Sequence, residues 1–176
     1  NGDIIWQSQL SRIKTETVID RLNDIDGAMI VDKGVLYAIS YQGSIAALDS
    51  FSGQILWSRE ASSIDGLSTN YDNIFYTDDN GILWCLEKYS GRPVWKQDNF
   101  KKRLIGTPIF LNDFILVGDI ENYIHIINAD DGTISGRIQL KSSIQSIYAE
   151  FDSIFVLDKD FNLNKYKINR ISQIEE

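Results

Sequence analysis

Few residues of this 176-residue chain belong to the types that carry out covalent or metal chemistry. The chain has one cysteine, Cys85, and one histidine, His125. A single cysteine cannot form an internal disulfide or the paired thiolates of a zinc knuckle. One histidine by itself cannot build a His-rich metal site or a recognisable Ser–His–Asp triad. We therefore expect no catalytic residue, no cofactor and no metal site.

Motifs for phosphate and calcium binding are also incomplete. The chain has neither a GxxxxGK[ST] loop nor a strand-linked GxGxxG, so no Gly-rich loop is available to hold a nucleotide. The segment 24–27, Asp-Ile-Asp-Gly, resembles part of a calcium loop. That motif needs an acid or Asn five residues before the glycine and a Glu six residues after it. Leu22 and Lys33 stand at those positions, so we predict no calcium site.

Two charged segments are the candidates for binding a partner. One is the stretch 11–26, which is the longest connection between sequence repeats; long connections on a rigid scaffold tend to carry binding residues. Its alternative interpretation is a solvated loop with incidental charge. The other is the basic run from Lys101 to Arg103, which could pair with an acidic partner surface or could be a solvated charge cluster.

Composition limits the class of partner. Lys and Arg total 17 and Asp and Glu total 25, which gives a net charge of -8 and a pI near 4.6. This balance argues against a large phosphate-binding surface, so nucleic acid is not an expected partner. No stretch approaches the ~18 apolar residues of a membrane span. The first residues carry no signal-peptide pattern, so we expect a soluble chain whose export signal has been removed or cut away.

Internal repeats must position these residues. The segment 45–57 is echoed residue for residue by 83–95, more briefly by 124–134, and the chain opens on the tail of another copy. Aligned glycines in successive copies are 51, 38 and 41 residues apart, and the last two spacings match the ~40-residue period of a four-stranded propeller blade. The longer first spacing contains the 11–26 connection.

Each repeat reads as short apolar strands separated by Gly, Asn, Asp and Ser turns. In the first repeat we expect strands at 28–31, 35–40, 44–48 and 54–59. Pro93 falls in a fourth strand, which must therefore be an edge of its blade. The pattern predicts a single all-β propeller domain or partial propeller over residues 1–176. Its parts are an orphan outer strand at 1–10, the connection at 11–26, four-stranded blades at 27–60, 67–98 and 106–140, and a three-stranded last blade at 145–168.

The orphan strand is of the type that the last blade lacks, so the simplest closure pairs residues 1–10 with the 145–168 blade. Two geometries stay open. The chain could form a small four-bladed ring. Alternatively, it could supply four blades of a larger ring, typically of eight, completed by a second chain or by sequence that is absent here.

Alignment of the repeats also gives structural roles to several conspicuous side chains. Cys85 shares a repeat position with small apolar residues, so we expect a buried apolar side chain rather than a nucleophile. We interpret His125 as a packed or partly exposed strand residue. Trp6, Trp57 and Trp95 recur at one repeat position, which predicts packing between blades.

The pattern A-L-D-x-x-S-G-x-x-x-W, at residues 47–57, resembles the blade motif of quinoprotein-like propellers. The segment 19–26, followed by 48–57, 103–108 and 117–119, is more specific. Together these segments look like the C-terminal half of a protein of the BamB family. The members of that family are lipoproteins of the outer-membrane β-barrel assembly machinery. The resemblance covers almost the whole chain, from Asn1 to about Ile168.

This resemblance implies a non-enzymatic scaffold on the periplasmic face of the bacterial outer membrane, held there by a lipid anchor that this chain lacks. In that family the partners are the periplasmic POTRA domains of BamA, and unfolded outer-membrane proteins are the clients. The resemblance associates Asp24 and Asp26 with the BamA-binding surface, and Arg21 lies in the same stretch. We add Arg103 from the basic run as a fourth partner-binding residue.

Two other functions remain as alternatives at this point. A generic propeller interaction module, unrelated to barrel assembly, would share the same repeats. A fragment of a quinoprotein dehydrogenase would share the blade motif, but such enzymes typically combine a calcium site with a quinone stacked between a tryptophan and a vicinal disulfide. The single cysteine excludes that disulfide. Whether this half alone binds BamA is a separate question that the sequence leaves open.

Overall fold

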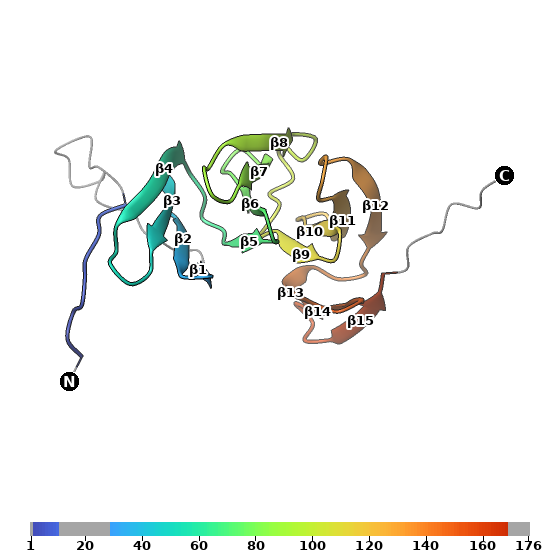
Figure 1. Cartoon of the computed structure of the whole chain (residues 1–176). Coiled ribbons are helices and arrows are strands. Elements are labelled where there is room, and N and C mark those ends of the chain that lie inside the picture. Colours follow the sequence, from blue (N-terminus) through green and yellow to red (C-terminus); the bar gives the residue numbers. More distant parts are fainter. Residues whose placement is uncertain (1, 11–28, 169–176) are drawn as a thin grey trace. The chain divides into compact units, whose positions relative to one another are not determined.

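Antiparallel β-strands form all the regular secondary structure in residues 2–10 and 29–168, the part of the chain that the computed structural model describes (Figure 1). The strands assemble into three four-stranded sheets and one three-stranded sheet. In this part of the chain no helix is long and apolar enough to span a membrane. The prediction of an all-β chain built from repeated antiparallel sheets is confirmed.

The chain divides into two compact units, here called unit 1 and unit 2, with the division between Pro108 and Ile109. Each sheet has its strands in chain order. Unit 1 contains the sheet β1 (Ile30–Asp32), β2 (Val35–Ile39), β3 (Gly43–Asp49) and β4 (Ile55–Ala61), and the sheet β5 (Leu67–Thr69), β6 (Asn73–Thr77), β7 (Leu83–Glu87) and β8 (Pro93–Gln97). Unit 2 contains the sheet β9 (Ile109–Leu111), β10 (Phe114–Gly118), β11 (Tyr123–Asn128) and β12 (Ile134–Gln139), and the sheet β13 (Ile144–Glu150), β14 (Ser153–Asp158) and β15 (Leu163–Lys167).

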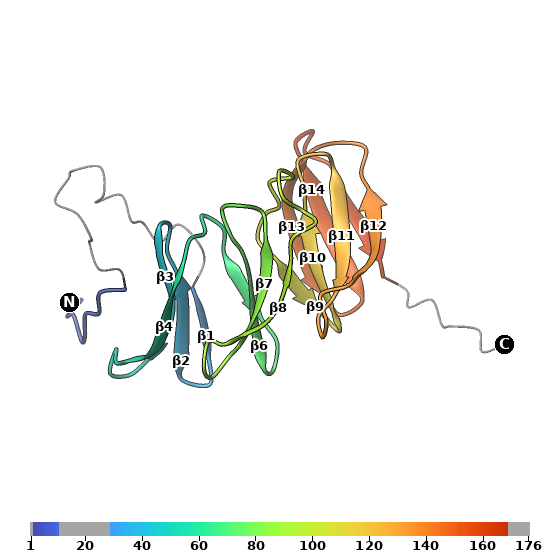
Figure 2. The same cartoon turned by 90° about the horizontal axis from the view of Figure 1, so that it is seen from above.

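Strand composition follows the position of each strand in its sheet. Residues 44–48 of β3 are all buried, as expected for an apolar inner strand that is covered on both faces. The outer strand β4 instead alternates between exposed and half-buried residues, and Figure 2 shows it beside β3. Pro93 begins β8, which is the edge of its sheet, so the prediction of an edge position for this proline is confirmed.

The turn between β3 and β4 explains the repeated Asp-x-x-Ser-Gly motif. The Asp49 carboxylate accepts hydrogen bonds from the Ser52 hydroxyl (2.7 Å) and from the backbone N–H groups of Ser52 (2.7 Å) and Phe51 (3.2 Å). These bonds stabilise the charged carboxylate and hold the pKa of Asp49 below its usual value. Gly53 follows with a φ of 71°, a left-handed conformation that glycine adopts without steric cost.

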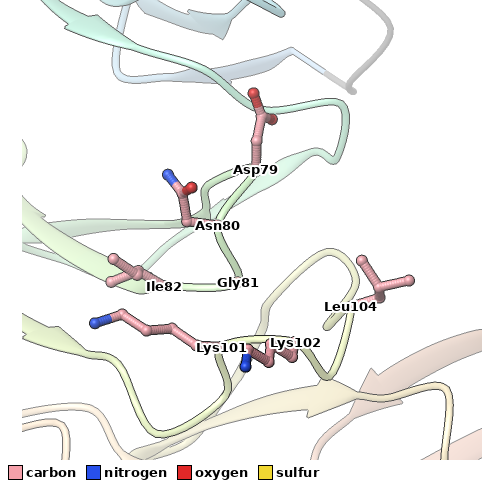
Figure 3. A pocket seen from close by; sticks show the side chains of 7 residues that line it. All are labelled: Asp79, Asn80, Gly81, Ile82, Lys101, Lys102 and Leu104. Atoms are coloured by element: carbon pink, nitrogen blue, oxygen red, sulfur yellow. The ribbon is translucent and has the colours of Figure 1, made fainter.

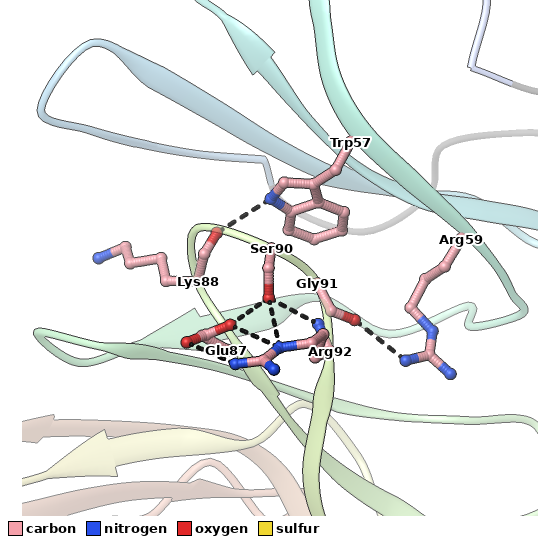
Figure 4. Close-up of polar contacts among 7 residues, drawn as sticks. All are labelled: Trp57, Arg59, Glu87, Lys88, Ser90, Gly91 and Arg92. Atoms are coloured by element: carbon pink, nitrogen blue, oxygen red, sulfur yellow. Dashed lines mark hydrogen bonds and ion pairs between the residues drawn. The ribbon is translucent and has the colours of Figure 1, made fainter.

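The Gly-x-x-x-Trp part of the motif joins neighbouring sheets of unit 1. The indole N–H of Trp57 on β4 donates to the backbone carbonyl of Lys88 in the next sheet (3.1 Å). Its ring lies so close to Gly91 that a Cβ there would be 2.6 Å from a ring atom (Figure 4). The Trp6 ring lies equally close to Gly53, where a Cβ would be 2.5 Å from a ring atom. The predicted packing between blades is therefore confirmed for Trp57, whose ring bridges two sheets, and the position of Trp6 on the first sheet agrees with it.

A buried lysine also links the two sheets of unit 1. The Lys88 side chain is 2% exposed, and its ammonium group lies 2.5 Å from the Asp32 carboxylate and donates to the Asn70 carbonyl (2.8 Å). The Lys88 hydrogen bond holds the pKa of Asp32 below its usual value. Nearby, burial raises the pKa of Tyr37 to about 12, and the Lys88 ammonium lies 5.8 Å from the centre of that ring.

The core of unit 1 is formed by the inner strands of both sheets. Cys85 is fully buried in this unit, which confirms its interpretation as a small apolar residue. The described members of the main cluster are Tyr37, Ile39, Ile45, Ala47, Leu67, Ile74, Tyr76 and Leu86.

Unit 2 has its own core, in which β13 lies against β9. Among the described residues its second sheet ends at β15, whose residues alternate between exposed and half-buried. The described members of the unit 2 cluster are Leu111, Leu116, Ile124, Leu140, Ile154 and Val156.

A buried polar pair closes the hairpin between β10 and β11 of unit 2. Asp119 and His125 are 5% and 4% exposed, and the His125 ring donates from Nε2 to the Asp119 carboxylate (2.8 Å). The other carboxylate oxygen accepts the backbone N–H groups of Glu121 and Tyr123, both at 2.9 Å. His125 is thus a packed strand residue, as interpreted, with a specific structural partner.

The predicted outer strand at 1–10 is not a strand in the described residues. Residues 2–10 have no regular secondary structure, because no described strand forms a ladder with them. This segment is held by Trp6 and by the Ser8 hydroxyl, which donates to the Gly53 carbonyl. Its pairing with the last blade stays a prediction.

Candidate functional site

Four loops lie at one end of the sheets of unit 1. They are the hairpin loops at 40–42 and 78–82 and the connections at 62–66 and 98–108, which follow β4 and β8. We call this set of loops the connection end. The opposite end carries the repeated turns, in which Asp49 and Glu87 accept hydrogen bonds from Ser52 and Ser90 and whose carbonyl groups accept hydrogen bonds from tryptophan side chains. Connections between sheets are less constrained by the repeat, so the connection end can carry specific binding residues.

Ser62 holds the loops of the connection end together. Its hydroxyl accepts the backbone N–H of Gln42 (2.7 Å) and donates to the Asp79 carboxylate. In return, the backbone N–H of Asp79 donates to the Ser62 carbonyl (3.2 Å). One serine therefore fixes the first connection against both hairpins.

The 98–108 connection is anchored by two buried side chains. Phe100 and Ile105 are 2% and 3% exposed. The Thr77 hydroxyl on β6 donates to the Gly106 carbonyl (3.1 Å), which fixes the end of the connection to the sheet. The residues between the two anchors are presented on a rigid base.

At the connection end, the environment of Asp65 disfavours the charged form of its carboxylate and raises its pKa. Burial raises its pKa, the nearby Asp79 carboxylate raises it further, and a hydrogen bond with the Thr107 side chain partly offsets both effects. The Thr107 hydroxyl also accepts the backbone N–H of Gly66 (3.0 Å). The folded chain thus keeps a partly buried acid at a cost in stability, as is common at functional sites.

We expect Asp65→Asn to raise the thermal stability of the chain at about pH 7. Because the folded-state pKa of Asp65 is raised, folding favours its protonated form, and the wild type gains stability from this group as the pH falls. The gap between variant and wild type should therefore shrink by about pH 3.5. Asp98→Asn is the matched control, because the Lys101 hydrogen bond lowers the pKa of Asp98. An Asp65→Asn variant less stable than wild type at neutral pH would contradict this interpretation.

A cavity of about 470 Å³ opens between the β6–β7 hairpin and the 98–108 connection (Figure 3). Its apolar lining comes from Ile82 and Leu104, and Lys101 and Lys102 provide its positive charge. Asp79 and Asn80 line it from the hairpin, and Figure 3 shows the Asp79 carboxylate pointing away from both lysines.

The structure places one of the four predicted partner-binding residues. Arg103 is half-buried on the 98–108 connection, and its backbone N–H donates to the Phe100 carbonyl (2.9 Å). Arg21, Asp24 and Asp26 lie outside the described residues.

Sequence reasoning missed the exposed apolar residue beside the basic run. Leu104 is 67% exposed and has a φ of 46°. In the sequence it stands beside Ile105 on the connection before the 106–140 blade, and nothing in the repeat distinguishes the exposed residue from the buried one. The described residues also contain no group of three or more His, Cys, Asp or Glu side chains that could hold a metal ion.

The family model described as outer membrane protein assembly factor BamB matches residues 1–97, more than half of the chain. The chain belongs to the BamB family. BamB of Yersinia pestis is 39% identical over 142 residues, which are 81% of this chain and 36% of that protein. The chain thus spans about a third of the length of this relative.

The crystal structure of BamB from Moraxella catarrhalis matches 93% of this chain and 49% of that chain, with a TM-score of 0.85 and 26% sequence identity. The four sheets therefore form a partial β-propeller of the BamB type. A quinohemoprotein alcohol dehydrogenase from Comamonas testosteroni matches 66% of this chain and 21% of that chain, with a TM-score of 0.57 and 18% identity. That likeness shows the fold alone, so by sequence the chain belongs with assembly factors and not with dehydrogenases.

Proposed function

We propose that this chain is part of a non-enzymatic adaptor in the outer-membrane β-barrel assembly machinery, and that it binds the periplasmic POTRA domains of BamA. The observation that carries the proposal is the match to the BamB family over residues 1–97. Unfolded outer-membrane proteins would be the clients of the complete assembly. A lipid anchor in the full-length protein would hold it on the periplasmic face of the outer membrane.

The physical basis of binding is a rigid sheet scaffold that presents charged connections. Arg103 lies at the connection end. Leu10, the last described residue before the 11–28 stretch, is held at this same end, because its carbonyl accepts the Ser44 hydroxyl (2.6 Å). A common binding surface for Arg103 and the acidic pair Asp24 and Asp26 is part of this proposal. Such charges contribute mainly to orientation and association rate.

We expect the double variant Asp24→Ala/Asp26→Ala to bind BamA POTRA domains more weakly by about 2 to 5 kcal/mol, because each removed carboxylate leaves a desolvated cationic or N–H partner unpaired. The measurement is isothermal titration calorimetry of the folded variant against the purified domains.

The matched control is Asp3→Ala/Asp130→Ala, which removes the same charge from two exposed positions. This control should bind like the wild type. Equal weakening by both double variants would show a general charge effect and would contradict a specific role for the acidic pair.

A further inference from the structure

Leu104 has an unusual combination of exposure and backbone conformation. It is an apolar residue in the left-handed region, with a φ of 46°, and Lys102 two residues earlier has a φ of 72°. For residues with a Cβ this conformation costs of order 1 kcal/mol each. The neighbouring anchors Phe100 and Ile105 are buried, so the fold holds the segment in this strained form. As a result, the apolar side chain of Leu104 is 67% exposed to solvent.

Leu104 is also one wall of the cavity at the connection end. Ile82 from the β6–β7 hairpin forms the facing apolar wall, and Figure 3 shows Lys101 passing beneath it. The cavity of about 470 Å³ is large enough for one or two side chains of a ligand. Gly81 allows the close approach of these two loops, because a Cβ there would be 2.9 Å from the Phe100 carbonyl oxygen.

The charge at this cavity is opposite to that of the chain. The chain carries a net charge of -8, yet the cavity is bordered by two lysines with Arg103 next to them in the sequence. The Lys101 ammonium group forms an exposed ion pair with the Asp98 carboxylate (2.8 Å). Lys102 is exposed and makes no ion pair with another described residue. An incoming carboxylate would therefore meet an ammonium group that no described carboxylate neutralises, next to an apolar wall.

We propose that this cavity binds an extended, acidic protein segment that places an apolar side chain between Ile82 and Leu104 and a carboxylate on Lys102. The two demands, an apolar group and an anion a few ångströms apart, are met by neighbouring residues of a peptide. An anionic membrane surface is disfavoured, because the negative charge of the whole chain opposes approach to it. The proposal does not depend on BamA, because the cavity and its charge define the ligand.

Fluorescence anisotropy with a labelled hexapeptide of alternating Glu and Leu tests this site. The wild type should bind this peptide, and should bind peptides of alternating Lys and Leu or of alternating Glu and Ser at least about tenfold more weakly. No binding of the Glu–Leu peptide by the folded chain, or equal binding of the Lys–Leu peptide, would overturn the proposal. Binding to vesicles of anionic lipid in place of the peptide would also overturn it.

Two variants locate the site. Leu104→Asn should weaken peptide binding about tenfold or more while leaving the thermal unfolding temperature unchanged or higher, because Asn tolerates the left-handed conformation. Lys102→Glu should have a similar effect on binding. Phe161→Asn is the matched control, since Phe161 is also exposed (81%) with a φ of 62° but belongs to unit 2. Wild-type binding by both site variants would overturn the assignment.

Discussion

Replacing Gly91 with alanine is expected to lower the free energy of unfolding by about 2 to 5 kcal/mol. Two independent costs add. The φ of 68° at this position costs an alanine about 1 to 2 kcal/mol. The new Cβ would also lie 2.6 Å from the Trp57 ring, and such overpacking typically costs about 1 to 3 kcal/mol. The Trp57 ring cannot move away without losing its hydrogen bond to the Lys88 carbonyl.

Urea unfolding followed by circular dichroism measures this loss. Gly136→Ala is the control, because a Cβ at Gly136 meets no atom within 4 Å and its backbone is not left-handed. This control should be within about 1 kcal/mol of the wild type. If the two alanine variants were equally stable, Trp–Gly packing between sheets would not hold unit 1 together.

Asp119→Ala is expected to destabilise unit 2 by about 3 to 5 kcal/mol. The substitution removes the acceptor of three hydrogen bonds at once, from two backbone N–H groups and from the His125 ring. His125 is 4% exposed, so water cannot easily replace the lost partner.

The same urea unfolding experiment, followed by circular dichroism, measures this variant. Asp130→Ala is its control, because Asp130 is an exposed turn residue, and it should leave the unfolding midpoint unchanged. Asp119→Asn should lose less stability than Asp119→Ala but more than Asp130→Ala, because the asparagine amide oxygen can still accept some of these hydrogen bonds. A loss below about 1 kcal/mol for Asp119→Ala would show that this hairpin does not need its buried pair.

The repeat pattern was sufficient to predict the sheets because each motif residue has a local physical role. Asp49 accepts the turn hydrogen bonds, Gly53 adopts the left-handed conformation, and Trp57 packs on the next sheet. In the second copy Glu87 accepts the Ser90 hydroxyl and Gly91 has a φ of 68°, so the match in sequence at the turn is also a match in structure. In the first sheet the observed strand bounds differ from the predicted ones by at most two residues. For example, the strand predicted at 28–31 is β1, Ile30–Asp32.

The pairing of His125 with Asp119 had a signal in the sequence that repeat alignment could have used. Asp78 stands six residues before Trp84, as Asp119 stands six residues before His125. The Asp78 carboxylate accepts the Trp84 indole N–H (2.9 Å), so both hairpins use the same closure with a different donor. An aspartate at this position followed by a donor six residues later therefore predicts the contact.

The features of the connection end could not be predicted in this way. The fixing of the loops by Ser62 and the exposure of Leu104 depend on how connections outside the repeat fold against the hairpins. A single sequence contains no second copy of those connections with which to compare them. The roles of Arg21, Asp24 and Asp26 stay a prediction, because these residues lie outside the described part of the chain.

The central claim is that this chain contributes to an adaptor for BamA, and titration of the wild-type chain with purified BamA POTRA domains by calorimetry tests it most directly. We expect saturable binding with one chain per POTRA partner, at a chain concentration where the free chain is shown to be folded and monodisperse. The absence of any binding heat or complex from such a sample would contradict the claim for this part of the BamB fold.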